Sequence, residues 1–431
     1  MTLPSTHALG ELWYEDMATT PTETPEAAST FVATATKLSH FDLDISGLKQ
    51  EVVADRTVQT APDGKPGDID ARRPGEFNFK VWLEGGATAT TSPGVLATML
   101  GAAMGGLTSP NAITDAAEAT STATRIKATA HGYLENEGIM IGVVGDARAA
   151  GKVGFIADAT GTGADDFDVQ IDYPVAPNAA DVIKAGHTLF LDYTDESYFD
   201  FLFIGAHAGT GATDDPDSCQ MIRCSLSGLE FGGFDEGAPW VQLTFRCGDW
   251  AWVNYASQAT FAHTTAASGA GPIGGAEAGS LCLQDAGTTT RNQIAAGGIS
   301  VAIPITLQPI RDAGYTNGIK GWVKVPNAPG VGPTIKFTPY FATIVDMPGL
   351  YNDMKARTAK QVQWQVGTTA QSVVAFYIQS GTLRAVDPSK RVALEDNTGL
   401  ELEVLGSNTN QTDLSTAAKR LMDAAIVVWL G

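Results

Sequence analysis

The amino-acid sequence predicts a mainly β protein with two β-sandwich or barrel units, each carrying one short helix, and a small inserted β module. A chain of 431 residues is too long for a single hydrophobic core. Its 47 glycines and 21 prolines are typical of many strands joined by turns, and less of a helical bundle. Apolar and polar side chains also alternate in many short runs, as they do in half-buried strands.

The most regular part of the chain combines a strand with a short helix. The run Phe77–Leu83 alternates apolar and polar side chains, which predicts a strand with one buried face. After a glycine and threonine loop, we expect Ser92 to cap a helix and Pro93 to take its first position. Apolar residues at helical spacing follow, and the glycine pair beginning at Gly105 predicts the helix end.

We expect a polar arm over residues 1–36, because its Thr-, Pro- and Glu-rich centre cannot bury much surface. A first β domain then begins with residues 37–112. Within it, the long polar segment Thr57–Asp70 is expected to be mobile or to be ordered by another subunit. Its candidate inter-subunit residues are Thr57, Asp63, Lys65, Asp68, Asp70, Arg72 and Arg73.

Residues 113–192 predict an inserted module of short strands joined by glycine turns. His131 precedes a glycine at a strand end, which favours a hydrogen bond within a turn over a chemical role. The segment Gly145–Val153 resembles a phosphate-binding loop only superficially. Five residues separate its glycines where such a loop has four, and Val153 stands where a hydroxyl should bind magnesium. We therefore expect no nucleotide site here.

The first β domain is expected to resume over residues 193–262, where the run Trp240–Cys247 is two-sided like Phe77–Leu83. A glycine- and alanine-rich linker over 263–280 predicts a domain boundary. Residues 281–431 predict a second β domain with several strands. Its one expected helix is Asp413–Ala424, capped by Asp413.

Composition limits the possible functions. Lysine and arginine total 27 against 48 aspartates and glutamates, a net charge of −21. This balance argues against a surface that grips nucleic acid through its phosphates. It fits a merely soluble acidic protein, and it also fits a wall along which nucleic acid slides without sticking.

The sequence also indicates where the protein folds. No apolar run approaches the ~18 residues of a membrane span, and the amino terminus lacks the pattern of a signal peptide. The spacing of Cys219, Cys224, Cys247 and Cys282 fits neither a zinc site nor a redox pair. We expect reduced thiols in a cytoplasm.

We assign no catalytic, cofactor-binding or metal-binding residue. The six histidines form no metal-binding pair, and no nucleophile motif occurs. Aspartates cluster around Asp166 and Asp215, each cluster in a glycine-flanked turn where aspartate commonly bonds its own backbone. Calcium binding is conceivable there, but neither cluster has the helix–loop–helix pattern.

The order of these elements resembles the tail tube (major tail) proteins of long-tailed, siphovirus-like bacteriophages. The strand ending in LEGG, its loop and SPGVLATMLGAAMGG follow one another as they do in that family. TAHGYLENEGIMIGVVG is similar to the start of a β insertion found in some members. CSLSGLEFGGFDEGAPWVQLTFRCGDW and QVQWQVGTTAQSVVAFYIQSGTLRAVDP resemble later strands. The likeness covers most of the chain and rests on pattern and order.

The resemblance implies two tail-tube-type β units and a structural virion protein without enzymatic activity or cofactor. Copies would stack as rings into a hollow tube through which the genome leaves. Two units in one chain favour a ring of three chains with pseudo-sixfold symmetry, although six chains are possible. The implied partners are other copies, other tail proteins such as the tape measure and terminator, and viral DNA passing without specific binding. The implied place is the virion tail, assembled in the bacterial host cytoplasm.

Two other classes stay open at this point. A phage adhesin or capsid-decorating protein shares the threonine- and glycine-rich β composition, but it forms spikes or caps a shell. A glycan-active β enzyme would need a carboxylate pair such as Asp166 with Asp215. Electron microscopy separates the first alternative from a tube, and loss of turnover on changing either aspartate is the test for the second.

Overall fold

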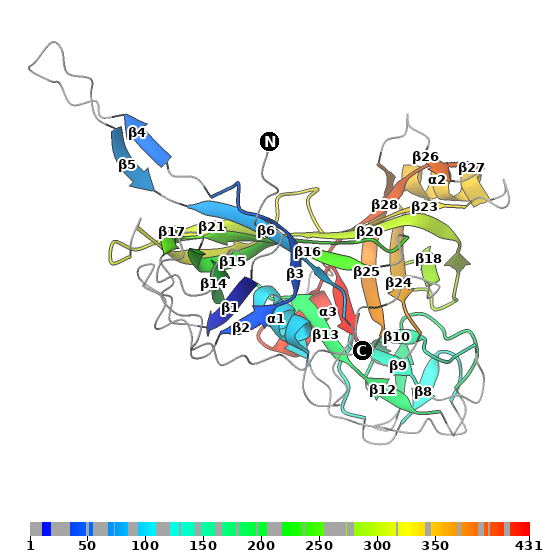
Figure 1. Cartoon of the computed structure of the whole chain (residues 1–431). Coiled ribbons are helices and arrows are strands. Elements are labelled where there is room, and N and C mark those ends of the chain that lie inside the picture. The colour runs from blue at the N-terminus through cyan, green and yellow to red at the C-terminus, as the bar shows by residue number, and fades with distance from the viewer. Residues whose placement is uncertain are drawn as a thin grey trace, which may run out of the picture.

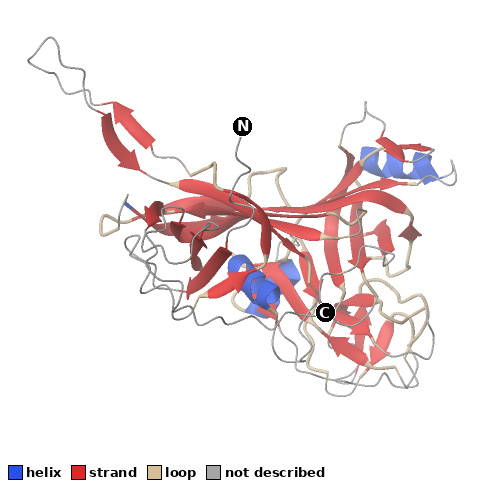
Figure 2. Ribbon diagram, in the orientation of Figure 1, coloured by secondary structure: helices blue, strands red, loops and turns tan. Residues whose placement is uncertain are grey.

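The computed structural model is mainly β, as predicted, and Figure 2 shows strands throughout the chain. It describes residues 11–18, 35–48, 51–54, 68–72, 74–84, 94–108, 121–128, 131–142, 148–159, 166–177, 181–194, 197–204, 218–235, 238–253, 273, 280–315, 318–340, 346–368, 372–386, 392–394, 397–408 and 414–431. Within these ranges, most strands belong to one network of 18, and five form a separate sheet.

The amino-terminal half supplies ten core elements, and a further group of strands lies between two of them. The core elements are β1 (Glu11–Ala18), β2 (Thr36–Leu38), β3 (His40–Asp44), β4 (Glu51–Ala54), β5 (Asp68–Arg72), β6 (Gly75–Trp82), α1 (Val95–Met104), β14 (Tyr198–Ile204), β15 (Ser218–Gly232) and β16 (Trp240–Cys247), followed by β17 (Asp249–Val253). The intervening strands are β7 (Gly105–Thr108), β8 (Arg125–Lys127), β9 (Gly138–Ile141), β10 (Val153–Asp158), β11 (Asp166–Val169), β12 (Ile183–Ala185) and β13 (His187–Leu191).

The carboxyl-terminal half has a similar series. Its elements are β18 (Ser280–Asp285), β19 (Gln293–Ile294), β20 (Ala296–Pro304), β21 (Thr306–Arg311), β22 (Ile319–Val325), β23 (Thr334–Pro339), α2 (Asp346–Ala356), β24 (Ala359–Val366), β25 (Val374–Ala385), β26 (Val392–Leu394), β27 (Asn397–Gly399), β28 (Leu402–Gly406), α3 (Ala417–Asp423) and β29 (Val427–Leu430).

The two halves repeat one pattern of strand pairing. In the first half β3 pairs with β6, β6 with β16, and β16 with β15, while β4 and β5 form a hairpin between β3 and β6. In the second half β20, β23, β28 and β25 pair in the same order, and the hairpin β21–β22 lies between β20 and β23. The outer pairs repeat as well, with β1–β14 matching β18–β24 and β15–β17 matching β25–β29. Helix α1 contacts β15, and α2 contacts β25.

Irregularities in the strands repeat at the same places. His40, Phe41 and Asp44 pair with Val81, Lys80 and Asn78 across a bulge. Ala296, Gly297 and Ser300 pair with Pro339, Thr338 and Lys336 across a bulge of the same size. Within each bulge one residue has a left-handed backbone, Asp42 with φ 50° and Gly298 with φ 62°. The same order of strand pairing and the same bulge in both halves identify them as structural repeats.

The two halves join edge to edge. Strand β15 of the first half pairs with β20 of the second, with Leu229 opposite Ile303 and Phe231 opposite Val301. These four side chains are buried. The row β3–β6–β16–β15–β20–β23–β28–β25 is therefore one continuous sheet of eight strands, and a hydrophobic cluster extends across both halves beneath it.

Strands β8–β12 form the separate five-stranded sheet, which lies below β24 and β25 in the view of Figure 1. It falls inside the predicted insertion of residues 113–192 and includes one strand more, β12, than expected. In the second half the chain passes from α2 to β24 without such a sheet. The division of the chain into domains at the predicted boundaries stays a prediction.

Several local expectations need correction. The helix after Phe77–Leu83 begins at Val95 with Gly94 as its cap. Ser92 and Pro93, the expected cap and first helical residue, lie outside the described residues. Gly105 ends the helix in a left-handed conformation, as predicted. The last helix is shorter than Asp413–Ala424, because its cap is Thr416, whose side chain accepts a hydrogen bond from the Lys419 amide.

Two elements were not anticipated. The predicted arm over residues 1–36 contains β1, whose Leu12 and Trp13 are fully buried, so this part of the arm belongs to the sheet. Helix α2 (Asp346–Ala356) falls in a segment where no helix was expected.

Candidate assembly surfaces

The predicted inter-subunit segment is a β-hairpin at its base. Asp68, Asp70 and Arg72 lie on β5, opposite Ala54, Val52 and Glu51 of β4. Strands β4 and β5 form a sheet of their own, which projects from the body of the molecule (Figure 1). Four further candidates lie outside the described residues, namely Thr57, Asp63, Lys65 and Arg73.

The eight-stranded row has an open edge at each end. At one end is β3 with the turn that follows it, closed by a hydrogen bond of 3.0 Å from the Leu48 amide to the Ile45 carbonyl. At the other end are residues 383–385 of β25, which pair with β28 on one side only among the described strands. Unpaired strand edges readily accept another strand. These edges therefore form a second candidate surface.

Comparison of the repeats shows what the two edges have in common with the internal junction. Gly228 pairs with Thr244 in the first half, and Arg384 pairs with Glu403 at the corresponding position of the second half. Glu230 and Val386 each lie two residues further along, so they are counterparts. By the bulge alignment, Ser46 is the counterpart of Ala302. Ala302 and Glu230 are opposed in the junction, whereas Ser46 and Val386 are both exposed. The open edges at β25 and β3 thus correspond to the two sides of the internal junction between β15 and β20.

One face of the eight-stranded row is polar, because alternate residues of each strand point away from the core. Along β6 the buried residues Phe77 and Phe79 alternate with Glu76, Asn78 and Lys80. Strand β16 shows the same alternation, as predicted for Trp240–Cys247. The two strands pair over their whole length, so residues 75–82 and 240–247 lie side by side in the sheet.

Three cations of this polar face are matched by carboxylates on neighbouring strands. Arg246 lies 3.3 Å from Glu76, and Lys80 lies 3.1 Å from Asp42. Arg384 lies 2.5 Å from Glu403. Exposed pairs of this kind contribute little to stability, but they leave the face with little net charge of either sign.

Glutamines of β24 attach the five-stranded sheet to the second half. The Gln363 side-chain amide donates to the Val153 carbonyl at 2.6 Å, and the Val153 amide donates to Gln365 Oε1 at 2.9 Å. Below them, the rings of Phe155 and Tyr377 stack with centroids 4.9 Å apart. Because both hydrogen bonds are buried, the inserted sheet is fixed to the other repeat. The segment once compared with a phosphate-binding loop thus has a structural role at Val153.

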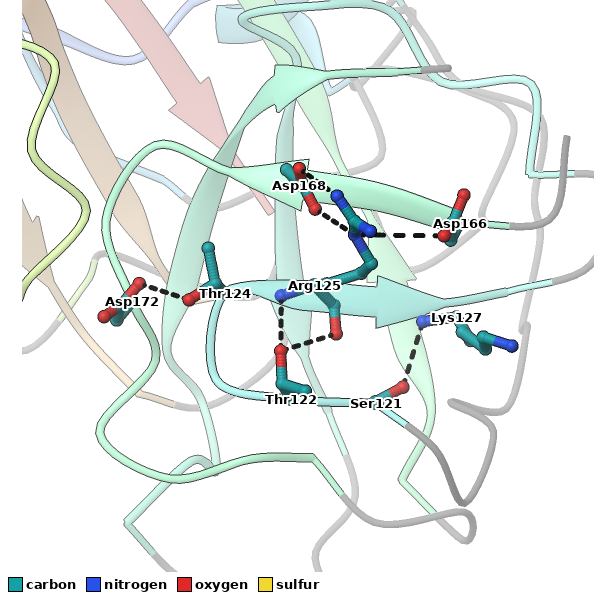
Figure 3. A network of polar contacts seen from close by, with 8 residues as sticks. All are labelled: Ser121, Thr122, Thr124, Arg125, Lys127, Asp166, Asp168 and Asp172. Carbon is teal, nitrogen blue, oxygen red and sulfur yellow. Dashed lines mark hydrogen bonds and ion pairs between the residues drawn. The ribbon is translucent and has the colours of Figure 1, made fainter. Parts of the chain in front are cut away.

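In the acidic cluster at Asp166, the carboxylates form ion pairs with the side chain of Arg125 (Figure 3). Arg125 Nε lies 2.6 Å from Asp168 and 3.8 Å from Asp166, which joins β8 to β11. The neighbouring Thr124 hydroxyl donates to Asp172 at 2.8 Å. These carboxylates stabilise the small sheet. Asp215, the other member of the glycan-enzyme pair, lies outside the described residues.

His131 has the structural role that was predicted. Its Nδ1 accepts a hydrogen bond of 3.1 Å from the Tyr133 amide, across a glycine with φ 62°. Among the described residues, no three histidine, cysteine, aspartate or glutamate side chains are grouped so that they would hold a metal ion.

The four cysteines are free and buried. Burial raises the pKa of the Cys219 thiol to about 12, and burial also raises the pKa of Cys224, next to Cys247. Such thiols stay protonated and unreactive. No helix in the described part of the chain is long and apolar enough to span a membrane.

Comparison of the chain with protein-family models and with curated protein sequences finds no match.

Proposed function

We propose that this chain is a structural protein that assembles with its own copies into closed rings, which stack into the hollow tail tube of a long-tailed bacteriophage. The observation that carries the proposal is the internal junction between β15 and β20, because it joins two equivalent units edge to edge. The same two kinds of edge recur at the end of β25 and at β3, where no further strand of the described residues pairs with them. Pairing β25 of one copy with β3 of the next repeats the junction and leaves no edge unpaired once the ring closes.

Each chain brings two units to such a ring. Three chains give six pseudo-equivalent units and 24 strands, since each chain contributes the eight strands of the row. A ring of six chains is the alternative and would have twice that circumference. We favour three because two units in each chain then give a ring with six pseudo-equivalent positions.

The polar face of the row suits a wall along which DNA moves. Three of its cations, Arg246, Lys80 and Arg384, are matched with carboxylates across strands, which reduces the number of points where the face could bind phosphate. The overall charge of −21 acts in the same direction. The tape measure and terminator proteins, as partners, and the virion tail, as the location, follow from the resemblance alone.

Electron microscopy of the concentrated purified protein tests the proposal. We expect hollow tubes with an axial channel and an axial repeat of stacked rings, and averaged end views should have three chains per ring. Closed compact particles would contradict the tube and favour the decorating-protein alternative. Rings of six chains would keep the tube but overturn the threefold arrangement.

A further inference from the structure

The hairpin β21–β22 of the second half is seated on the first half. Gly321 lies so close to Tyr198 that a Cβ atom at this position would come within 2.1 Å of the tyrosine ring. The Arg246 guanidinium carbon lies 5.6 Å from the centroid of the Trp322 ring. Beyond β16, Gly248 lies beside the Ile319 side chain, which would be in ordinary contact, at 3.5 Å, with a Cβ atom at this position. The second repeat therefore contacts the first through the hairpin β21–β22 as well as through the pairing of β20 with β15.

The repeat predicts where the corresponding seat lies on the second half. Strands β15 and β25 each contain a bulge at the same place of the repeat. Just beyond it, Ser225 pairs with Arg246 in the first half and Thr382 pairs with Leu405 in the second. Leu405 is thus the counterpart of Arg246, and Ser407, two residues further, is the counterpart of Gly248. The seat on the second half is expected around these two residues.

An open groove of about 630 Å³ lies at that place. Leu405 and Ser407 line it together with the turn that contains Pro333, and α3 closes another side through Arg420. Most of the exposed lining is apolar, and Leu414 at its rim is 42 % exposed. An exposed apolar groove of this kind marks an interaction site.

We propose that hairpin β4–β5 of a second copy occupies this groove. The hairpin is the counterpart of β21–β22, and in a single chain it projects from the body (Figure 1). It follows β3, the strand whose open edge matches β25, so one neighbouring copy supplies both parts of the contact. Strands β4 and β5 place Val53 opposite Ile69, so these two apolar residues share one face of the hairpin. This inference rests on the proposed ring and specifies its contact.

Cysteine cross-linking of the full-length chain tests the seat. In hairpin β4–β5, Asp68 lies as many residue pairs from the base of the hairpin as Trp322 does in hairpin β21–β22. Asp68 is therefore the position that corresponds to Trp322. We pair Asp68→Cys with Ser407→Cys, which is exposed, and treat the assembled protein with a short bis-maleimide. The four native cysteines are buried and do not compete. The control combines Asp68→Cys with Thr290→Cys, an exposed residue away from the groove.

We expect roughly tenfold more inter-chain cross-link for Asp68→Cys with Ser407→Cys than for the control, since groups held side by side react at a far higher effective concentration. Mixing isotopically light and heavy chains shows whether the linked peptides come from two copies. If tubes form without this cross-link, the proposed position of the hairpin in the groove is wrong, whereas the proposed tube still stands. Cross-links within single chains would also overturn it. A chain that neither assembles nor cross-links between copies would overturn both proposals.

Discussion

The side chain of Lys360 fastens helix α2 to the sheet. Its Nζ lies 2.5 Å from both Asp285 of β18 and Asp353 of α2. Burial alone lowers the pKa of Lys360, but the hydrogen bonds and charges of the two aspartates outweigh it and raise the pKa above the ordinary 10.5. The stability that this charge contributes is therefore complete below pH 10.5 and is lost as the pH rises through the folded-state pKa.

We expect Lys360→Met to lower the free energy of unfolding by about 2 kcal/mol at neutral pH, because two carboxylates lose a charged donor. The difference from the unmodified chain should shrink above pH 10.5. Urea unfolding at several pH values measures both effects, with Lys320→Met on β22 as the matched control. A difference that stayed constant across this range would indicate lost packing, and the charge would not be its cause.

At the residue scale the sequence predicted alternation well and the repeat not at all. The buried and exposed residues of Phe77–Leu83 follow directly from their order along one strand. Equivalent positions of the two halves, however, hold unlike side chains, such as Phe41 with Gly297 or Arg246 with Leu405. Even the left-handed bulge residue differs, Asp42 in one half and Gly298 in the other. Backbone geometry preserves the repeat where the side chains no longer do.

The open edges β3 and β25 make a prediction at the scale of elements. If β25 of one copy pairs with β3 of the next as β15 pairs with β20, Ser46 faces Val386 across the new junction. We expect Ser46→Cys combined with Val386→Cys to form disulfides between chains on oxidation of the tubes, because directly opposed residues lie within ~5.5 Å. Denaturing electrophoresis should show products up to the trimer and none beyond it.

The control for this edge prediction is Ser46→Cys combined with Thr382→Cys, four residues earlier on β25. That separation is more than ~13 Å along a strand, so the pair should not link. Equal linking of both pairs would contradict the register. A ladder that continues beyond three chains would contradict a ring closed by three.

Elements with weak local signals were the ones that the sequence did not predict. Helix α2 includes Pro348 and Gly349, both poor helix formers, and it is held by Lys360 and the sheet beneath it. Strand β1 carries charged residues around Trp13, and its burial depends on pairing with β14, far along the chain. The polar hairpin segment was predicted as a candidate contact, but the groove around Leu405 was not. A groove built from a turn, a strand end and a helix has no signature in any single stretch.

At the scale of the whole molecule, charge should control assembly. Each chain carries −21, so copies repel one another when they meet. Salt shortens the reach of this repulsion from about 30 Å at 0.01 M to about 10 Å at 0.1 M. We expect light scattering to show faster polymerisation at the higher salt concentration. Faster assembly at the lower concentration would mean that attraction between opposite charges dominates the contact.

The five-stranded sheet occurs once in each chain, whereas the units of the eight-stranded row occur twice. Because the second half passes from α2 to β24 without such a sheet, it cannot be present on every unit of the proposed ring. The channel would then repeat at every unit and the inserted sheets only at every second one. A molecule passing through the channel would meet six similar positions per ring, and a binder of the inserted sheet would find three.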